Sequence, residues 1–154
     1  MKTVIRFAGP DDAAAIARLE HECFSNPWSL ASVAEELENP CAFIYVAECR
    51  RRIVGWAGML VAADEGQILN VAVSPSYRRR GIGRKLVEAL IELAKEKKLS
   101  YLTLEMRRSN SPAAALYSLC GFLPAGMRKA YYTRPDEDAV IMNLTLPGDS
   151  EAVT

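Results

Sequence analysis

The strongest constraint that the sequence places on the possible fold of this chain is a run of six residues, Arg78-Arg79-Arg80-Gly81-Ile82-Gly83. They lie between an apolar run from Ile68 to Val73 and a helical pattern that begins near Arg84. A loop of this kind leaves backbone N–H groups unpaired at a helix start, and the helix dipole and guanidinium groups add positive potential there. Glycine lets phosphate oxygens approach those N–H groups closely. The segment therefore predicts a strand, a diphosphate-binding loop and a helix.

The alternative for this segment is an ordinary solvated turn, which is what an arginine run more often forms. The strand before the run, and the Gly-x-Gly pair and helix after it, favour a binding site. A nucleoside-triphosphate loop does not fit, because no Lys-Ser or Lys-Thr follows the second glycine. The formal net charge of zero also argues against a protein that coats nucleic acid.

The length of 154 residues predicts one domain with a core of its own. We expect that domain over residues 1–147, followed by a flexible C-terminal tail at 148–154. No apolar run reaches the ~18 residues of a membrane span, and Arg6 interrupts the N-terminal apolar stretch. A cytoplasmic protein without a membrane partner is the expectation. The four cysteines lack metal-ligand spacing, so we expect them to be small apolar residues and expect no bound metal.

Hydrophobic periodicity predicts strands that first form hairpins and then alternate with helices. The expected strands are Thr3–Ala8, Ala42–Cys49, Ile53–Ala62, Gln67–Val73, Tyr101–Met106, Phe122–Thr133 and Ala139–Leu146. The expected helices follow Pro10, run from Ser29 through Glu38, follow the Gly loop, and run from Ser111 to about Cys120. This order predicts an α/β (α+β) fold, with one mixed sheet of about seven strands and about four helices on its two faces.

Glu105 is the carboxylate of greatest interest. The alternation of its strand directs it away from Leu102, Leu104 and Met106, which form the apolar side. It is either a solvated residue at a strand end or an acid that lines a cleft. Because open α/β sheets build active sites at strand ends beside phosphate loops, the second interpretation gains weight.

Four aromatic residues also invite two interpretations. Tyr117 lies beside the expected core stripe of its helix, which we assign to Ala113, Leu116 and Cys120, so it is either structural or functional. Trp28, Tyr131 and Tyr132 lie in segments rich in turn residues, where aromatics form either satellite core or the walls of a peptide slot. The single histidine, His21, leaves most catalytic triads without a candidate.

The chain resembles the GCN5-related N-acetyltransferases. The segments that carry the resemblance are the Arg78–Gly83 loop after Ile68–Val73, then Leu104-Glu105-Met106-Arg107, Asn110, and Ala115-Leu116-Tyr117 through Gly121-Phe122. It implies a sheet that splays open at its centre and the use of acetyl-CoA. It also implies that Glu105 is a general base and Tyr117 a general acid. Cofactor contacts are implied for Val71, Ala72, Val73, Asn110 and the loop residues Arg78, Arg79, Arg80, Gly81, Ile82 and Gly83.

Within this family, the chain is most similar to the bacterial enzymes that acetylate a ribosomal-protein alanine. The segments concerned are Cys23 to Ser29, Leu104 to Arg107, Tyr131-Tyr132 and Glu137-Asp138-Ala139. The resemblance implies direct acetyl transfer to the N-terminal alanine of a small-subunit ribosomal protein, bound between Trp28 and the Tyr131-Tyr132 segment. We expect a monomer or weak dimer without direct nucleic-acid contact. A broader protein N-terminal or small-amine acetyltransferase, and a non-catalytic acetyl-CoA-binding module, are the alternatives.

Overall fold

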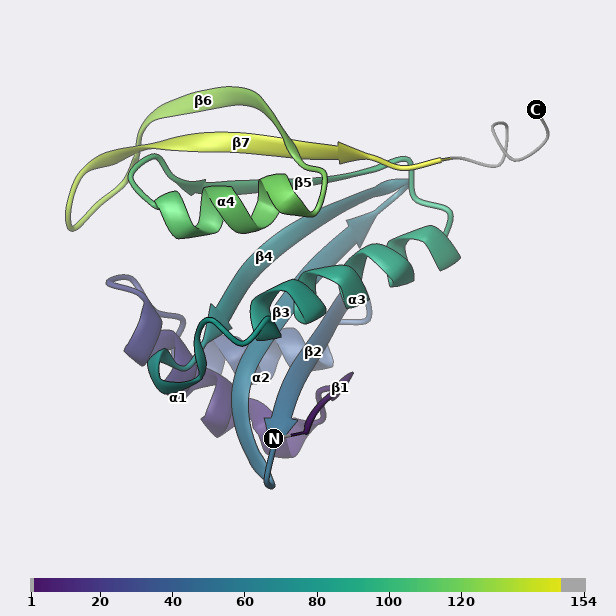
Figure 1. Ribbon diagram of the computed structural model, residues 1–154, viewed down its shortest axis with the longest axis vertical. Helices are drawn as coiled ribbons and strands as arrows, with labels where there is room; N and C mark the ends of the chain where they lie inside the picture. Colours follow the sequence, from purple (N-terminus) through teal and green to yellow (C-terminus); the bar gives the residue numbers. More distant parts are fainter. Residues whose placement is uncertain (1, 148–154) are drawn as a thin grey trace.

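Seven strands form one sheet in the order β1-β2-β3-β4-β5-β7-β6 (Figure 1). The computed structural model describes residues 2–147. The strands are β1 (Thr3–Phe7), β2 (Ala42–Cys49), β3 (Arg52–Ala62), β4 (Glu65–Val73), β5 (Tyr101–Arg107), β6 (Leu123–Tyr132) and β7 (Glu137–Thr145). The helices are α1 (Ala13–Cys23), α2 (Leu30–Glu38), α3 (Ile82–Glu96) and α4 (Ser111–Leu119), with short 3-10 turns η1 (Pro10–Asp12) and η2 (Pro75–Tyr77). The predicted fold class is confirmed.

The centre of the sheet is open, as the family resemblance implies. All neighbouring strands are antiparallel except β4 and β5, which are parallel and joined through α3. Their pairing covers only Glu65–Gln67 against Tyr101–Thr103. Beyond these residues the two strands diverge, which is visible in Figure 1 as the widening angle between β4 and β5. Residues 68–73 of β4 and 104–107 of β5 therefore do not hydrogen-bond to each other's strand.

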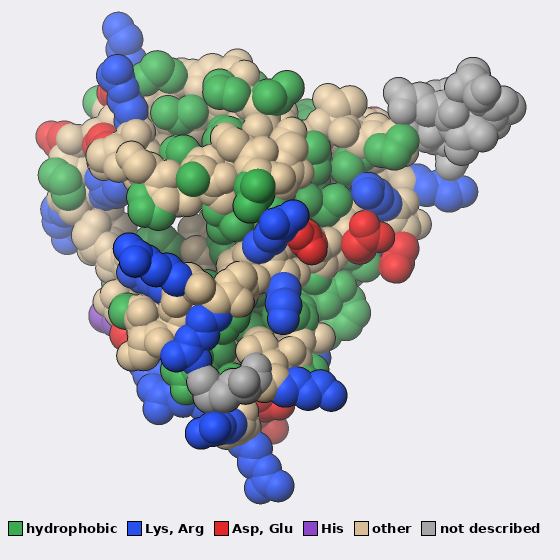
Figure 2. Space-filling view, in the orientation of Figure 1, with side chains coloured by type: hydrophobic (Ala, Val, Ile, Leu, Met, Phe, Trp, Pro, Cys, Tyr) green, Lys and Arg blue, Asp and Glu red, His purple; other side chains and the backbone are tan. Residues whose placement is uncertain are grey.

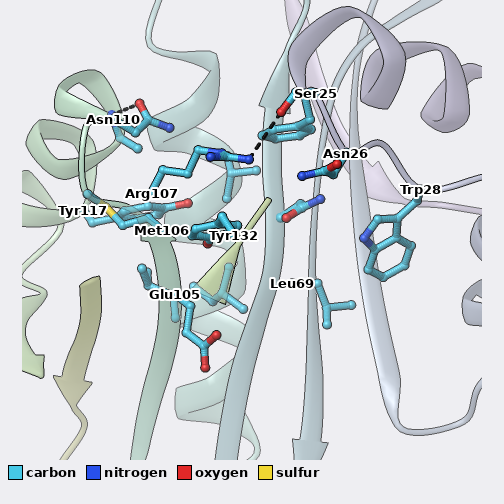
Figure 3. Close-up of a pocket in the computed structure, with 16 residues that line it drawn as sticks. Ser25, Asn26, Trp28, Leu69, Glu105, Met106, Arg107, Asn110, Tyr117 and Tyr132 are labelled. Carbon is cyan, nitrogen blue, oxygen red and sulfur yellow. Dashed lines mark hydrogen bonds between the residues drawn. The ribbon is translucent and has the colours of Figure 1, made fainter. Parts of the chain in front are cut away.

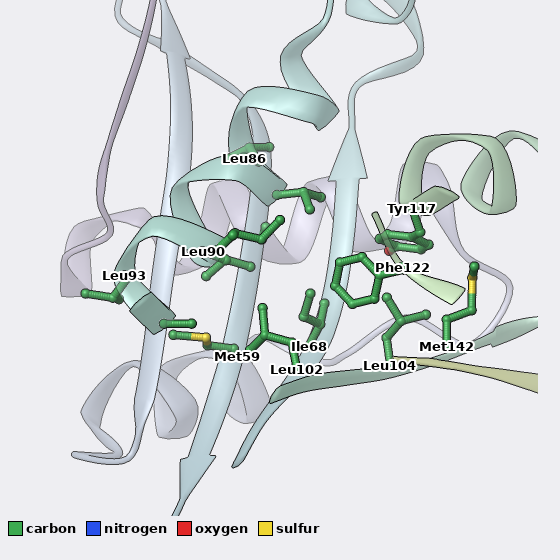
Figure 4. Packing of buried hydrophobic residues seen from close by; sticks show 14 of the residues in the cluster. Met59, Ile68, Leu86, Leu90, Leu93, Leu102, Leu104, Tyr117, Phe122 and Met142 are labelled. Atoms are coloured by element: carbon green, nitrogen blue, oxygen red, sulfur yellow. The ribbon is translucent and has the colours of Figure 1, made fainter. Parts of the chain in front are cut away.

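Two apolar cores hold the helices on opposite faces of the sheet. On one face α3 and α4 pack over the strands, with Leu86, Leu90, Leu104, Tyr117 and Phe122 in the same cluster (Figure 4). On the other face α1 and α2 cover a separate cluster that includes Ile16, Leu19, Val33 and Trp56. The opening between β4 and β5 therefore connects one helical layer with the other.

Local signals account for the helix boundaries. Ser29 caps α2 by accepting a hydrogen bond from the Ser32 N–H at 3.1 Å, as predicted from sequence. Gly81 precedes α3 in the left-handed conformation, with φ of 78°, and Gly121 ends the α4 segment with φ of 101°.

The predicted core stripe of α4 packs against the core but omits the most buried residue of the helix. Tyr117 is the buried residue of this helix, whereas Ala113, Leu116 and Cys120 are only partly buried. The reason is that Tyr117 meets the Phe122 ring edge to face and shares one buried cluster with Leu104 of β5 and Met142 of β7 (Figure 4), which the periodicity of the helix alone does not reveal.

In the described part of the chain no helix is both long and apolar enough to cross a membrane. The predicted tail at 148–154 lies outside the described residues, and the domain boundary at 147 stays a prediction.

Candidate active site at the opening of the sheet

A pocket of about 240 Å³ occupies the opening between β4 and β5. Its walls come from the α1–α2 loop, from β4, from β5 and from α4 with the residue before it, together with Tyr132 (Figure 3). Figure 2 shows the surface hollowed between the part of the molecule that carries α4 and the part below it, with Lys and Arg side chains beside the hollow. The pocket thus lies where strand pairing stops.

A β-bulge shapes the β4 wall. Ala57 pairs with Val71 and Met59 pairs with Ile68, so two residues of β4, Leu69 and Asn70, oppose one residue of β3. A bulge changes the direction of side chains and backbone groups and leaves one residue unpaired. Leu69, Asn70 and Val71 all line the pocket. The sequence prediction named Val71, Ala72 and Val73, which follow the bulge on the same strand.

Glu105 lines the pocket from β5. It points to the face opposite Leu104 and Met106, which are buried in the α3 core. Its Oε1 forms an ion pair with Arg128 Nε at 3.2 Å, and its side chain is 14% exposed. The Tyr131 hydroxyl also hydrogen-bonds to Glu105, and this bond is the main cause that raises the pKa of Tyr131. The carboxylate is therefore held at the pocket wall.

Tyr117 reaches the same pocket from α4, on the other face of the sheet. Its ring meets Phe122 edge to face with 5.7 Å between centroids, and the residue is 7% exposed. Burial, with smaller contributions from Tyr132 and Cys120, raises the pKa of Tyr117 far above its usual value. The phenol is thus protonated at neutral pH. Figure 3 shows Tyr117 and Trp28 on opposite sides of the pocket, with Glu105 between them.

The Arg78–Gly83 loop fits an anion. Arg79 and Gly81 have positive φ values of 65° and 78°, and α3 begins at Ile82, so its first N–H groups have no acceptor within the helix. The first turn of α3 contains no acidic residue. A side chain at Gly83 would bring its Cβ to 3.3 Å from Leu116 and 3.7 Å from Val73, which places this helix end between β4 and α4. These features suit a diphosphate beside the pocket.

Three residues predicted to contact a cofactor also have partners within the protein. Arg78 donates from Nε to the Val73 carbonyl at 3.1 Å, so its side chain folds back over the end of β4. Asn110 lines the pocket and caps α4, because its Oδ1 accepts from the Ala113 N–H at 3.2 Å. Arg80 lies over the Tyr77 ring, 5.0 Å from its centroid.

The predicted aromatic wall is brought together around Glu105. Trp28 and Tyr132 line the pocket, whereas Tyr131 lies outside its lining and contacts Glu105. Tyr131 and Tyr132 meet edge to face at 5.1 Å, and burial raises the pKa of Tyr132 to about 12. Trp28 packs against Trp56 at 5.8 Å.

Sequence reasoning missed two residues that join the loops over the pocket. Arg107 donates to the Thr133 and Pro135 carbonyls, both at 2.8 Å, and Asn26 Nδ2 donates to the Thr133 carbonyl at 2.6 Å. These bonds connect the α1–α2 loop and β5 with the β6–β7 loop. Arg107 belongs to a segment that carries the family resemblance, but no local pattern predicts its partners, which are 26 and 28 residues away.

Sequence reasoning also missed a carboxylate behind the pocket. Glu20 of α1 is fully buried and is bonded to Trp28, Trp56 and Asn70. Its spacing on α1, next to Leu19 and His21, gave no sign of these partners. Within residues 2–147, no group of three or more His, Cys, Asp or Glu side chains is arranged to hold a metal ion.

Residues 13–122 match the model of the acetyltransferase (GNAT) family. The chain belongs to this family. A Bacillus subtilis (strain 168) protein, provisionally named ribosomal protein bS18-alanine N-acetyltransferase, is 39% identical over 94% of this chain and 97% of its own length. The ribosomal protein bS18-alanine N-acetyltransferase of Escherichia coli (strain K12) is 34% identical over 88% of this chain and 92% of its own.

Solved structures agree with the sequence relatives. The crystal structure of the Escherichia coli ribosomal-protein-S18-alanine N-acetyltransferase superimposes with a TM-score of 0.88 at 32% identity, covering 96% of this chain and 97% of that one. Family membership confirms the predicted activity class: the protein is an acetyl-CoA-dependent N-acetyltransferase. A fold neighbour from Thermoplasma acidophilum, with a TM-score of 0.81 at 18% identity, was solved in complex with coenzyme A.

Proposed function

We propose that this GNAT enzyme acetylates the N-terminal alanine of ribosomal protein bS18. The names of the relatives suggest this acceptor. The observation that carries the proposal is the placement of Glu105 in a pocket whose acceptor side is walled by Trp28 and Tyr132. A carboxylate at the end of an aromatic slot suits the amino end of an extended peptide. Arg107 and Asn26 stabilise the slot by joining the two loops that form it.

The chemistry of the acceptor favours an α-amine over a lysine side chain. Only the neutral amine attacks a carbonyl carbon. Because the reference pKa is ~8 for an α-amine and ~10.4 for lysine, neutralising the α-amine costs about 3 kcal/mol less near neutral pH, at ~1.36 kcal/mol per pKa unit. One carboxylate is then a sufficient base without histidine, and Glu105 takes the proton from the attacking nitrogen, directly or through one water.

The cofactor supplies an acetyl group activated as a thioester. The N-terminal N–H groups of α3 and the Arg78–Gly83 loop would hold its diphosphate. The part of β4 that is not paired with β5 would face its pantetheine arm. A backbone N–H near Val71 stabilises the oxyanion, a contribution of about 3 kcal/mol for one well-placed donor. Tyr117, protonated because of its burial, donates to the sulfur as negative charge develops there. No covalent acyl-enzyme is required.

The acceptor assignment is tested by turnover on short peptides. The peptides begin with Ala, Ser, Met or Gly, and free lysine and a polyamine serve as other amines. We expect the Ala-starting peptide to be acetylated at its α-amine, with kcat/KM at least tenfold above every non-peptide amine. Equal turnover on all peptides would favour the broader N-terminal acetyltransferase, and preference for a polyamine would favour the small-amine enzyme.

Other properties of the enzyme stay proposals. We place it in the cytoplasm, where ribosomal proteins are made, and expect a monomer or weak dimer that contacts its protein substrate without binding nucleic acid. Cofactor uptake without product on any amine would favour the non-catalytic module, against which the pairing of Glu105 and Tyr117 in one pocket argues.

A further inference from the structure

Glu20 is a buried carboxylate that faces nitrogen donors only. Its Oε1 accepts from the Trp28 backbone N–H at 3.0 Å, and its Oε2 accepts from Trp56 Nε1 at 3.1 Å. Asn70 Nδ2 completes the set, at 3.0 Å from Oε1 and 3.1 Å from Oε2. The two tryptophan groups can donate but cannot accept. Burial raises the pKa of Glu20, and the hydrogen bonds from Trp28, Asn70 and Trp56 act in the opposite direction by stabilising the ionised carboxylate.

This arrangement determines which way the Asn70 amide points. A side-chain amide has a donor nitrogen and an acceptor oxygen on the same planar group. Reversing the amide would place Oδ1 about 3 Å from two carboxylate oxygens, with no hydrogen between them, which is strongly unfavourable. The charge of Glu20 thus holds Nδ2 toward α1 and directs Oδ1 away from it.

Asn70 lies at the pocket, where its side-chain oxygen can contact the amine substrate. It belongs to the β4 bulge, lines the pocket with Glu105, and lies on the sheet face covered by α1. Glu105 points to that same face, and Tyr117 approaches from the other. Among the residues that the structure describes, no donor is hydrogen-bonded to Asn70 Oδ1. Asn70 Oδ1 is therefore a hydrogen-bond acceptor at the pocket, and the bonds from Asn70 Nδ2 to Glu20 fix its direction.

We propose that Asn70 is a specificity-determining residue whose Oδ1 accepts a hydrogen bond from an N–H group at the amino end of the acceptor, and that Glu20 is its positioning residue. The inference rests on the proposed function, because a peptide amino end offers such N–H groups both at its α-amine and at its first amide. Through the Trp28 N–H, the same carboxylate also ties the aromatic wall to the bulge.

Steady-state kinetics on an Ala-starting peptide test the role of Asn70. We expect Asn70→Ala to lower kcat/KM for the peptide about tenfold, mainly through KM, the usual size for one lost hydrogen bond to a substrate. The KM for acetyl-CoA should stay within twofold. Gln67→Ala is the matched control, since it removes a carboxamide from an exposed position of the same strand, outside the pocket. A peptide kcat/KM within twofold of wild type, or an equal rise in both KM values, would overturn the assignment.

A double-mutant cycle tests the role of Glu20. We expect Glu20→Gln to lower peptide kcat/KM about fivefold in the wild-type background and less than twofold in Asn70→Ala, because Gln no longer dictates the direction of the amide. Glu92→Gln, an exposed change on α3, is the control. Equal losses in both backgrounds would mean that Glu20 only supports the fold, and would overturn its positioning role. If Glu20→Gln does not fold, Asn70→Gln replaces it in the test. The longer side chain displaces the amide oxygen, so this variant should lose as much peptide kcat/KM as Asn70→Ala. Full activity of Asn70→Gln would contradict the proposal.

Peptide analogues distinguish the two possible donors. A peptide methylated on its first amide nitrogen lacks that N–H but keeps the α-amine. If the amide is the donor, methylation weakens turnover by wild type and not by Asn70→Ala; if the α-amine is the donor, both enzymes respond equally to methylation. Either result supports the assignment when Asn70→Ala impairs the unmodified peptide.

Binding of a coenzyme A–peptide conjugate separates this inference from the proposed function. If the conjugate binds wild type no more tightly than coenzyme A does, the peptide-acceptor proposal fails. Asn70→Ala is then assayed on the amine that the wild-type enzyme does acetylate, and unchanged kinetics with that amine would overturn the inference. If the conjugate binds more tightly than coenzyme A, and equally to wild type and Asn70→Ala, the inference fails while the proposed function stands.

Discussion

The two ends of β4 behave as different structures although they are one strand. At the closed end, Glu65–Gln67 pair with β5, and Gly66 is so crowded that a Cβ there would lie 2.5 Å from Leu102 Cδ2. At the open end, pairing with β5 has ceased, a bulge interrupts the register with β3, and Leu69, Asn70 and Val71 face a pocket. Strand pairing stabilises the fold at one end, and its absence makes room for chemistry at the other.

This contrast separates two kinds of substitution. Changes around the open end should alter turnover or ligand binding with little effect on stability. Changes at the closed end should alter stability with little effect on kinetics. A mixed outcome at either end would break the distinction.

The largest effect is expected for Glu105→Gln. Loss of the base should lower kcat about 10²- to 10³-fold, since general base catalysis contributes on that order. Acetyl-CoA affinity, measured by calorimetry, should change less than twofold. Glu92→Gln, an exposed carboxylate change far from the opening, should retain full kcat. A kcat for Glu105→Gln within threefold of wild type would remove Glu105 from the mechanism.

Tyr117→Phe comes next, with a fall in kcat of about 10- to 100-fold for loss of the proton donor. Tyr101→Phe is the matched control, because it removes a hydroxyl at the closed end, where Tyr101 interacts with Glu65. Unchanged kcat in Tyr117→Phe would assign Tyr117 to the core.

The pH profile sharpens the role of Tyr117. Because burial raises the pKa of Tyr117, the phenol stays protonated at every pH below that raised pKa. We therefore expect no loss of activity from Tyr117 ionisation as the pH rises to about 10, the reference pKa of tyrosine. A wild-type alkaline limb below pH 10 that disappears in Tyr117→Phe would contradict this expectation.

Gly83→Val should weaken acetyl-CoA binding about tenfold, because a branched side chain at the start of α3 crowds Leu116 and the N–H groups meant for the diphosphate. Peptide KM should be unaffected. The control is Gly9→Val, which introduces the same side chain where no atom lies within 4 Å of the new Cβ. Unchanged coenzyme A affinity would show that the diphosphate binds elsewhere.

The smallest effect belongs to the closed end. Gly66→Ala should lower the free energy of unfolding by about 1 kcal/mol, because the new methyl group overlaps a flexible end of Leu102 that must move. Denaturant unfolding measures this change, and kcat should stay within twofold. Gly126→Ala is the comparison, because its Cβ would have an ordinary 3.8 Å contact with Ile141. A kinetic defect in Gly66→Ala with no loss of stability would contradict the division of β4.

Family membership and fold class followed from local patterns in the sequence. The arginine–glycine loop, the Ser29 cap, the start of α4 at Ser111-Pro112 and the alternation of β5 each depend on neighbouring residues, and each appears close to its predicted bounds. Glu105, Tyr117, Trp28 and Tyr132, which the sequence analysis singled out, line one pocket, and their roles there stay predictions. Such features are readable because a cap, a turn or a strand face is decided within a few residues.

Only the tertiary structure decided where β4 and β5 separate, and that Tyr117 rather than its neighbours is the buried residue of α4. It also decided that Glu20 accepts a hydrogen bond from Asn70, fifty residues away in the chain. These outcomes depend on which groups from distant segments share a desolvated space. A buried carboxylate or phenol acquires its partners and its pKa from all the elements packed around it, and no local window of sequence contains those elements.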